Sequence, residues 1–249
     1  MKRYSPAAAI RSIDGRSVRV LGDGLDIRFR DAGLRFGSRV ALQPQTITLA
    51  QRRIGIIGLN GSGKTSFARM INGLAAPTSG AVSVNGLDTV KDAKQVLAEV
   101  GFIFQNPQNQ IILPIVRDDI AFGLKNRGIK GAELNARVDS ILARFGIRDL
   151  GGRRAHELSG GELQLVALCA VLVTGPNVLI LDEPTNQLDL KNRARVEQTL
   201  AALDEDLIVI SHDLPLLAGF DRVLVFDNGR IVADTDPGSA IAQYRELAA

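Results

Sequence analysis

Apolar and polar residues follow two different periods along this chain. Short runs that alternate or are continuously apolar predict strands, and longer stretches with apolar residues three or four positions apart predict helices. The continuously apolar run 54–57 ends in glycine, which is typical of a strand buried on both faces of a parallel sheet. Other predicted strands are 25–29, 33–36, 46–49, 81–84, 101–104, 178–181 and 207–210. Predicted helices are 66–74, 91–98, 118–125, 132–145, 162–173 and 191–203.

The order of these elements divides the chain. The first strands alternate apolar and polar residues, as antiparallel strands with one exposed face do. A strand–helix rhythm follows, but the segment 106–161 has almost no strand pattern, and glycines punctuate its helices. Asn228 and Gly229 separate two alternating runs and tolerate the positive φ angles of a tight hairpin turn. We therefore predict an α/β fold with a parallel core into which a helical subdomain, about 106–161, is inserted.

Composition excludes several classes of protein. The chain has 249 residues, of which 45% are hydrophobic and 23% charged, so it is globular rather than disordered. A net charge of +3 is too even for a bulk nucleic-acid binder, and we expect no nucleic-acid partner. No run reaches the roughly 18 apolar residues of a membrane-spanning helix. The single cysteine, Cys169, lies in an apolar run and is predicted to be a buried hydrophobe rather than a nucleophile.

The first 39 residues carry nine Lys or Arg and four Asp or Glu, a local excess of positive charge. Residues 1–24 match no motif, and their apolar segment is too short for a secretory signal. We expect a solvated, partly disordered leader there, before a domain that spans 25–249. The alternative is weak attraction of this leader to an anionic membrane surface.

A phosphate-binding loop is the sharpest local motif. A glycine, four residues and then Gly-Lys-Thr stand between a buried strand and a helix. In such loops Lys64 reaches the β- and γ-phosphate oxygens, and the Thr65 hydroxyl ligates Mg²⁺. A dinucleotide-binding GxGxxG is rejected because no third glycine follows Gly61 and Gly63. The predicted ATP-binding residues of this loop are Gly58, Leu59, Asn60, Gly61, Ser62, Gly63, Lys64, Thr65 and Ser66.

Two further motifs support the loop. Asp182 ends the apolar strand 178–181 and is placed to hold Mg²⁺, while Glu183 is placed to orient or deprotonate the attacking water. An acidic helix start is the structural alternative for this pair. Ser159, Gly160 and Gly161 precede an apolar helix, where a serine N-cap and two glycines leave backbone N–H groups open to an anion.

The three motifs, in this order, resemble the nucleotide-binding subunit of an ABC transporter over about residues 25–235. The resemblance implies a P-loop NTPase (RecA-like) core with a parallel sheet, an N-terminal antiparallel β subdomain and an inserted helical subdomain. It also implies an ATPase that uses ATP and Mg²⁺. The implied catalytic residues are Lys64, Gln105, Glu183 and His212, and the implied Mg²⁺ ligands are Thr65, Gln105 and Asp182.

The resemblance assigns roles to residues outside the three motifs. Gln105 matches the glutamine loop, Asp189 the D-loop aspartate and His212 the switch histidine. Phe36 falls where the family places an aromatic ring against adenine, and a core position is the equally weighted alternative. Glu162 departs from the glutamine of many relatives, and its carboxylate repels a γ-phosphate unless it is turned away. His156 matches no motif.

The family also implies partners. Two cassettes dimerise head to tail, and each ATP lies between one phosphate loop and the partner's Ser159, Gly160 and Gly161. The second ATPase subunit is an identical chain or a homologue. The resemblance further implies a transmembrane coupling subunit, a substrate-binding membrane subunit and a peripheral location on the cytoplasmic face of the cell membrane.

Finer similarities narrow the kind of transporter. Residues 104–110 and 115–123 resemble the energy-coupling-factor group, which imports vitamins and transition-metal ions. Residues 86–94, 114–116 and 214–227 are similar to ATPases of biotin uptake systems, with cobalt or nickel uptake as the alternative. Two other classes remain: a soluble ABC ATPase that acts on DNA or ribosomes, and a small-molecule kinase, against which the motif 158–162 argues.

Overall fold

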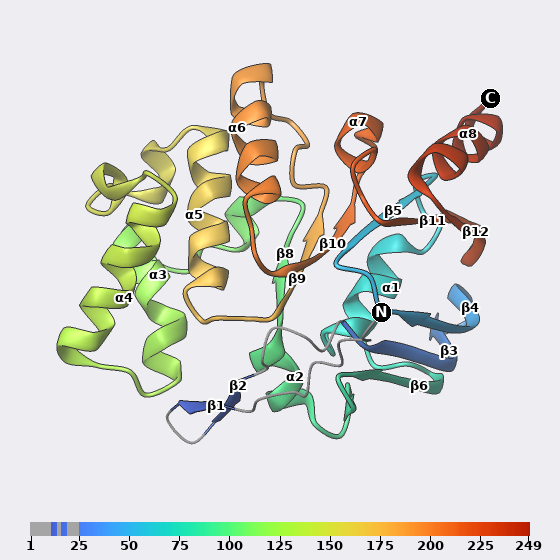
Figure 1. Ribbon diagram of the computed structural model, residues 1–249, viewed down its shortest axis with the longest axis horizontal. Helices are drawn as coiled ribbons and strands as arrows, with labels where there is room; N and C mark the ends of the chain where they lie inside the picture. The colour runs from blue at the N-terminus through green and yellow to red at the C-terminus, as the bar shows by residue number, and fades with distance from the viewer. Residues whose placement is uncertain (1–10, 14–15, 19–24) are drawn as a thin grey trace, which may run out of the picture.

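The structure is a computed structural model that describes residues 11–13, 16–18 and 25–249 (Figure 1). Two three-residue strands, β1 (Arg11–Ile13) and β2 (Arg16–Val18), form an antiparallel pair. Apart from these six residues, the leader predicted at 1–24 lies outside the described part of the chain.

A six-stranded sheet forms the centre of the molecule, in the order β12-β11-β5-β10-β9-β8. Five of its strands run parallel, and β12 pairs antiparallel with β11 at one edge. The strands are β5 (Arg53–Gly58), β8 (Val100–Ile103), β9 (Val178–Asp182), β10 (Asp206–Ile210), β11 (Arg222–Asp227) and β12 (Arg230–Thr235). Asn228 and Gly229 have φ angles of 45° and 74°, so the predicted hairpin turn between β11 and β12 is confirmed.

A second, antiparallel sheet has the order β4-β3-β6-β7. Its strands are β3 (Ile27–Phe36), β4 (Arg39–Leu49), β6 (Ser79–Val84) and β7 (Leu87–Asp88). The prediction of two separate strands at 25–29 and 33–36 is wrong, because β3 is continuous through both. Its register shifts between Phe29 and Ala32, where Asp31 adopts a φ of 49°. This bulge interrupts the alternation of the sequence without ending the strand.

Eight α-helices accompany the sheets in the described chain, and six of them follow the predicted positions within a few residues. They are α1 (Lys64–Ile71), α2 (Ala93–Glu99), α3 (Val116–Asn126), α4 (Gly131–Arg144), α5 (Gly160–Leu172), α6 (Leu190–Ala201), α7 (Leu214–Leu217) and α8 (Pro237–Ala248). Sequence analysis missed α7 and α8. Helices α3 and α4 lie to one side of the central sheet, next to α5 (Figure 1). No helix among the described residues is long and apolar enough to cross a membrane.

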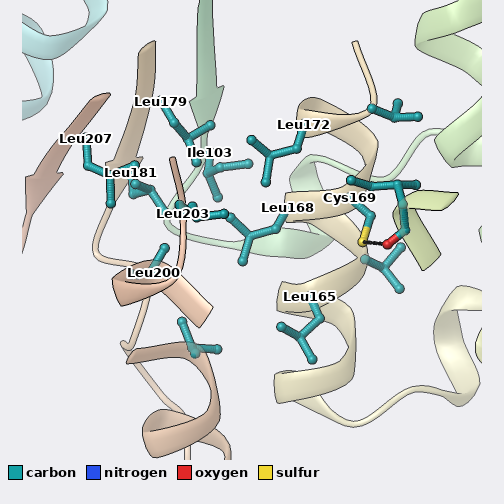
Figure 2. Packing of buried hydrophobic residues seen from close by; sticks show 14 of the residues in the cluster. Ile103, Leu165, Leu168, Cys169, Leu172, Leu179, Leu181, Leu200, Leu203 and Leu207 are labelled. Carbon is teal, nitrogen blue, oxygen red and sulfur yellow. Dashed lines mark hydrogen bonds between the residues drawn. The ribbon is translucent and has the colours of Figure 1, made fainter. Parts of the chain in front are cut away.

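The core is divided by the central sheet, and alternate residues of each strand enter different halves. On β9, Val178 and Ile180 pack with α1 and the antiparallel sheet, whereas Leu179 and Leu181 pack with α5 and α6 (Figure 2). Cys169 lies in the second half, fully buried, with its Sγ 4.0 Å from the Ile141 carbonyl oxygen (Figure 2). Burial raises the pKa of the Cys169 thiol far above its ordinary value, so the predicted apolar role is confirmed.

Candidate active site

Four parallel strands end at the same edge of the central sheet, where open α/β sheets gather their ligands. β5 leads into the phosphate loop, β8 into Gln105, β9 ends with Asp182, and β10 leads into Ser211 and His212. These segments surround a cavity of about 460 Å³. Its lining residues are Leu59, Asn60, Gly61, Lys64, Thr65, Gln105, Asp182, Glu183, Asn186, His212 and Tyr244.

The phosphate loop is held in place by its neighbours. Gly63 caps α1 with a φ of 104°, and a Cβ at this position would lie 2.7 Å from the Ala41 carbonyl oxygen. A side chain is therefore excluded there by both backbone conformation and space. The hairpin turn braces the loop from outside, because the Gly229 N–H donates to the Ser62 carbonyl at 2.9 Å and the Gln43 N–H to the Gly229 carbonyl at 2.8 Å.

Lys64 stands at the start of α1 with its side chain turned back onto the loop. Its ammonium donates to the carbonyl oxygens of Gly58 and Leu59 at 2.7 and 2.9 Å. Only 7% of the residue is exposed. Burial lowers the pKa of Lys64, while the carboxyls of Glu183 and Asp182 act in the opposite direction. Lys64 is therefore a buried cation at the N-terminus of α1, where an anion is favourably bound.

Thr65 and Asp182 form an oxygen-lined corner of the cavity. The Thr65 hydroxyl donates to Asp182 Oδ2 at 2.9 Å. Burial raises the pKa of Asp182, and the Thr65 hydrogen bond opposes that rise. A hydroxyl, a carboxylate and the nearby amide of Gln105 are hard oxygen donors, and Mg²⁺ takes few protein ligands besides water and phosphate oxygens. The donor set therefore fits Mg²⁺.

Glu183 and His212 face each other across the same cavity. The His212 backbone N–H donates to Glu183 Oε2, and His212 Nε2 lies 3.2 Å from Glu183 Oε1. Burial raises the pKa of Glu183, with the His212 hydrogen bond as the main opposing effect. Burial also lowers the pKa of His212, and the charge of Lys64 adds to that effect. A buried carboxylate with a raised pKa beside a neutral imidazole is an arrangement suited to proton transfer.

Phe36 lies outside the core. It is 60% exposed at the end of β3, so the core alternative for this residue is wrong. With Arg39, Ala41 and residues 61–66 it lines a second cavity of about 230 Å³. An exposed aromatic face beside the phosphate loop is a suitable platform for a flat base.

Ser159, Gly160 and Gly161 line neither of these two cavities. Ser159 caps α5, and Glu162 turns back to it: Glu162 Oε2 accepts from the Ser159 N–H and hydroxyl, each at 2.8 Å. These hydrogen bonds lower the pKa of Glu162. The carboxylate that sequence analysis regarded as repulsive is thus engaged at the helix cap.

The helix start at Ser159 is linked to Asp189. Asp189 caps α6 by accepting from the Asn192 N–H at 2.8 Å, and Asn192 Nδ2 donates to its other carboxylate oxygen at 2.8 Å. A Cβ at Gly161 would lie 2.3 Å from Asn192 Oδ1. Gly161 therefore lets α5 approach the Asp189 cap closely.

Sequence reasoning missed several residues around the cavity. Tyr244 of α8 contacts His212, and Asp213 accepts hydrogen bonds from Arg193 and from the Thr185 hydroxyl. Asp213 thereby ties the segment after β10 to α6 and to the segment after Glu183. The Asp236-Pro237 pair is an N-cap followed by a first-turn proline, a signal from which α8 could have been predicted. No local signal points from Tyr244 to His212.

The following family and relatives, which this chain resembles, are described as transporters or as components of transport systems. Residues 45–186 match the family described as ABC transporter. The biotin transport ATP-binding protein BioM of Rhizobium etli is 66% identical over 225 residues, 90% of this chain and 100% of that protein. The energy-coupling factor transporter ATP-binding protein EcfA1 of Latilactobacillus sakei is 36% identical over 84% of this chain and 77% of that protein. The structure of cbiO1 from Clostridium perfringens, described as part of the ABC transporter complex cbiONQ, aligns with a TM-score of 0.78 and 28% identity over 90% of this chain and 94% of that one.

Proposed function

Because this chain belongs to the ABC transporter family, as an ATPase of the energy-coupling-factor type, we propose that it powers the import of biotin. The proposed ATP hydrolysis is supported by one observation: four side chains line a single cavity at the sheet edge, namely Lys64, Asp182, Glu183 and His212. The proposal that biotin is the transported substrate rests on the 66% identity to BioM along that protein's whole length.

ATP would lie across both cavities. Phe36 would stack on the adenine, and residues 58–66 would surround the phosphates with backbone N–H groups. Lys64 would exchange its two carbonyl partners for the β- and γ-phosphate oxygens, since its ammonium already lies within the loop. Thr65, Asp182 and Gln105 would hold Mg²⁺. When bound, this ion neutralises the charge that develops on the phosphate oxygens.

Glu183 would act as the general base. Its carboxylate accepts a proton from the attacking water, whose oxygen then bonds to the γ-phosphorus while the bond to the β-phosphate oxygen breaks. His212, whose Nε2 lies 3.2 Å from Glu183 Oε1, would orient that carboxylate and would donate to the γ-phosphate when ATP is bound. The Glu183 side chain is only 12% exposed, and its shielding from bulk water strengthens its interaction with His212, whose side chain is 40% exposed.

The partner cassette would complete each site. Ser159, Gly160 and Gly161 lie outside their own chain's cavities, so their N–H groups would meet the γ-phosphate held by a second chain in a head-to-tail dimer. Loss of the phosphate would remove these contacts and let the dimer open. We propose that Gln105 transmits this change to a transmembrane coupling subunit, and that the chain is peripheral to the cytoplasmic face of the membrane.

The test is uptake by the assembled complex. The chain would be co-expressed with a candidate transmembrane coupling subunit and a candidate substrate-binding membrane subunit, in cells that cannot make or import biotin. Labelled biotin should accumulate with the wild-type chain and fail to accumulate with Glu183→Gln. Accumulation of labelled cobalt instead of biotin would leave the ATPase mechanism intact but overturn the proposed substrate.

A further inference from the structure

His212 has a polar partner on each side of its ring. Nε2 lies 3.2 Å from Glu183 Oε1, and Nδ1 lies 3.2 Å from the hydroxyl oxygen of Tyr244. The rings of His212 and Tyr244 are tilted by 44°, with centroids 6.4 Å apart. Both ring nitrogens are thus paired by side chains, one from the catalytic edge of the sheet and one from α8.

The two contacts favour one of the two tautomers of a neutral imidazole. An ionised carboxylate only accepts hydrogen bonds, so the Nε2 that faces Glu183 carries the proton. Nδ1 is then an acceptor, and the Tyr244 hydroxyl is the donor to it. The same tautomer presents an N–H donor on the side of the ring where the γ-phosphate would lie.

Helix α8 is anchored in a way that fixes Tyr244. Asp236 caps it by accepting from the Ser239 N–H at 3.1 Å, and Ala240 is fully buried. Gln243 Nε2 donates to the Val232 carbonyl at 3.5 Å, which ties α8 to β12. The half-buried ring of Tyr244 packs against the core, and the residue forms part of the wall of the 460 Å³ cavity. In Figure 1, α8 lies beside β11 and β12 at the C-terminal end of the chain.

We propose that Tyr244 is a positioning residue for ATP hydrolysis: its hydroxyl donates to His212 Nδ1 and holds the Nε2–H tautomer directed at Glu183 and the γ-phosphate. The proposal rests on the role proposed for His212. It also makes the C-terminal helix a part of the catalytic apparatus, because α8 has no other contact with His212 among the hydrogen bonds of the described residues.

Tyr244→Phe is the discriminating variant, since it keeps the packed ring and removes only the hydroxyl. In the assembled transporter we expect kcat for ATP to fall about three- to tenfold, the range of one lost hydrogen bond. KM for ATP should stay within about twofold, because Tyr244 is not part of the phosphate loop. The matched control is Glu246→Ala, an exposed position of the same helix that does not line the cavity, and it should retain the wild-type kcat.

A double-mutant cycle separates positioning from a general effect on the fold. Tyr244→Phe should slow the wild type but cause no further loss in a His212→Ala background, where the hydroxyl has nothing to position. Equal losses in both backgrounds would overturn the proposal. An unchanged kcat of Tyr244→Phe, with an unchanged melting temperature, would overturn it as well.

The tautomer can be observed directly, without hydrolysis. The full-length chain contains two histidines, so ¹⁵N spectra of the imidazoles hold two sets of signals, and His212→Ala identifies the relevant one. The wild type should show an unprotonated Nδ1 and a protonated Nε2, and Tyr244→Phe should shift both signals toward a mixture of tautomers. Unchanged signals in that variant would contradict the proposal. This measurement needs neither ATP nor biotin. The position of the His212 proton can therefore be determined even if the proposed transport function proves wrong.

Discussion

The Thr65 hydroxyl and the Asp182 carboxylate, 117 positions apart in the chain, lie one hydrogen bond apart at 2.9 Å. Their meeting depends on the sheet order, in which β5 and β9 flank β10 and end at the same edge. Neither residue is positioned by its local sequence alone. The hydroxyl and the carboxylate are hard oxygen donors of the kind that Mg²⁺ prefers, and under the proposed function they would hold that ion.

The Asp182→Asn variant tests this pair. The amide oxygen can still accept from Thr65, but the charge that favours a cation is lost. We expect the Mg²⁺ concentration for half-maximal ATPase activity to rise about tenfold or more. Binding of a fluorescent ATP analogue in EDTA should be unchanged. If that metal-free binding is lost too, Asp182 supports the fold of the loop rather than the ion.

The Glu183→Gln variant tests the general base. ATP binding should persist while the hydrolysis rate falls about 10²-fold or more, since the proton acceptor is gone. Loss of ATP binding would instead assign Glu183 a structural role.

The pH dependence of the rate gives an independent test of the same residue. Burial raises the pKa of Glu183, and a base must be ionised to act. The wild-type rate should therefore fall as the pH drops, beginning at a higher pH than an ordinary glutamate would give. The small residual rate of Glu183→Gln should lack this acid limb. A profile shared by both proteins would assign the limb to another group.

Substitutions at the start of α5 test the completion of the site by a second chain. In a Glu183→Gln background, ATP should drive dimerisation, measured by light scattering, and Ser159→Ala should weaken it. Glu162→Gln should strengthen it, because the amide oxygen can still cap Ser159 while a charge near the γ-phosphate is removed. Full ATPase speed from a dilute monomer carrying Ser159→Ala would refute a shared site.

Asp119 provides a stability test away from the cavity. Its buried carboxylate accepts from the backbone N–H groups of Ile112 and Leu113 at 2.7 and 2.8 Å. Asp119→Ala would leave both groups unpaired and should lower the free energy of unfolding by about 2 kcal/mol. Denaturant unfolding of the full chain measures this, with exposed Asp118→Ala as the control.

The same carboxyl predicts a pH trend with a definite sign. Burial raises the pKa of Asp119 in the folded protein, more than its backbone hydrogen bonds lower it. The folded state then holds the proton more tightly than the unfolded state, so stability is lost as the pH rises through the folded pKa. Relative to Asp119→Asn, the wild type should become less stable over that interval. A difference independent of pH would contradict this.

The sequence predicted what local chemistry determines. The apolar run 54–57 and the glycines that follow it are enough to predict a buried strand and a tight loop. The two residues Asn228 and Gly229 are likewise enough to predict the hairpin turn. The predicted α/β fold class is confirmed by the alignment with the structure of cbiO1. The roles of the site residues stay predictions, although the structure brings Lys64, Asp182 and His212 to one cavity.

What sequence analysis missed depends on distant partners. The bulge at Asp31 is set by pairing with two neighbouring strands, so alternation alone predicted a break there. Tyr244 lies in no recognisable sequence motif. Its contact with His212, 32 residues away, forms only when α8 packs on the sheet. Such contacts are products of tertiary packing rather than of local propensity.

Gly229 has a consequence for the thermodynamics of nucleotide capture. Its two backbone hydrogen bonds fasten the phosphate loop to the C-terminal hairpin and to the strand β4. The entropy lost in shaping the loop is therefore lost when the protein folds rather than when ATP arrives. ATP would then meet a loop whose backbone is already shaped, and more of the free energy of its contacts would remain available for binding the proposed second subunit.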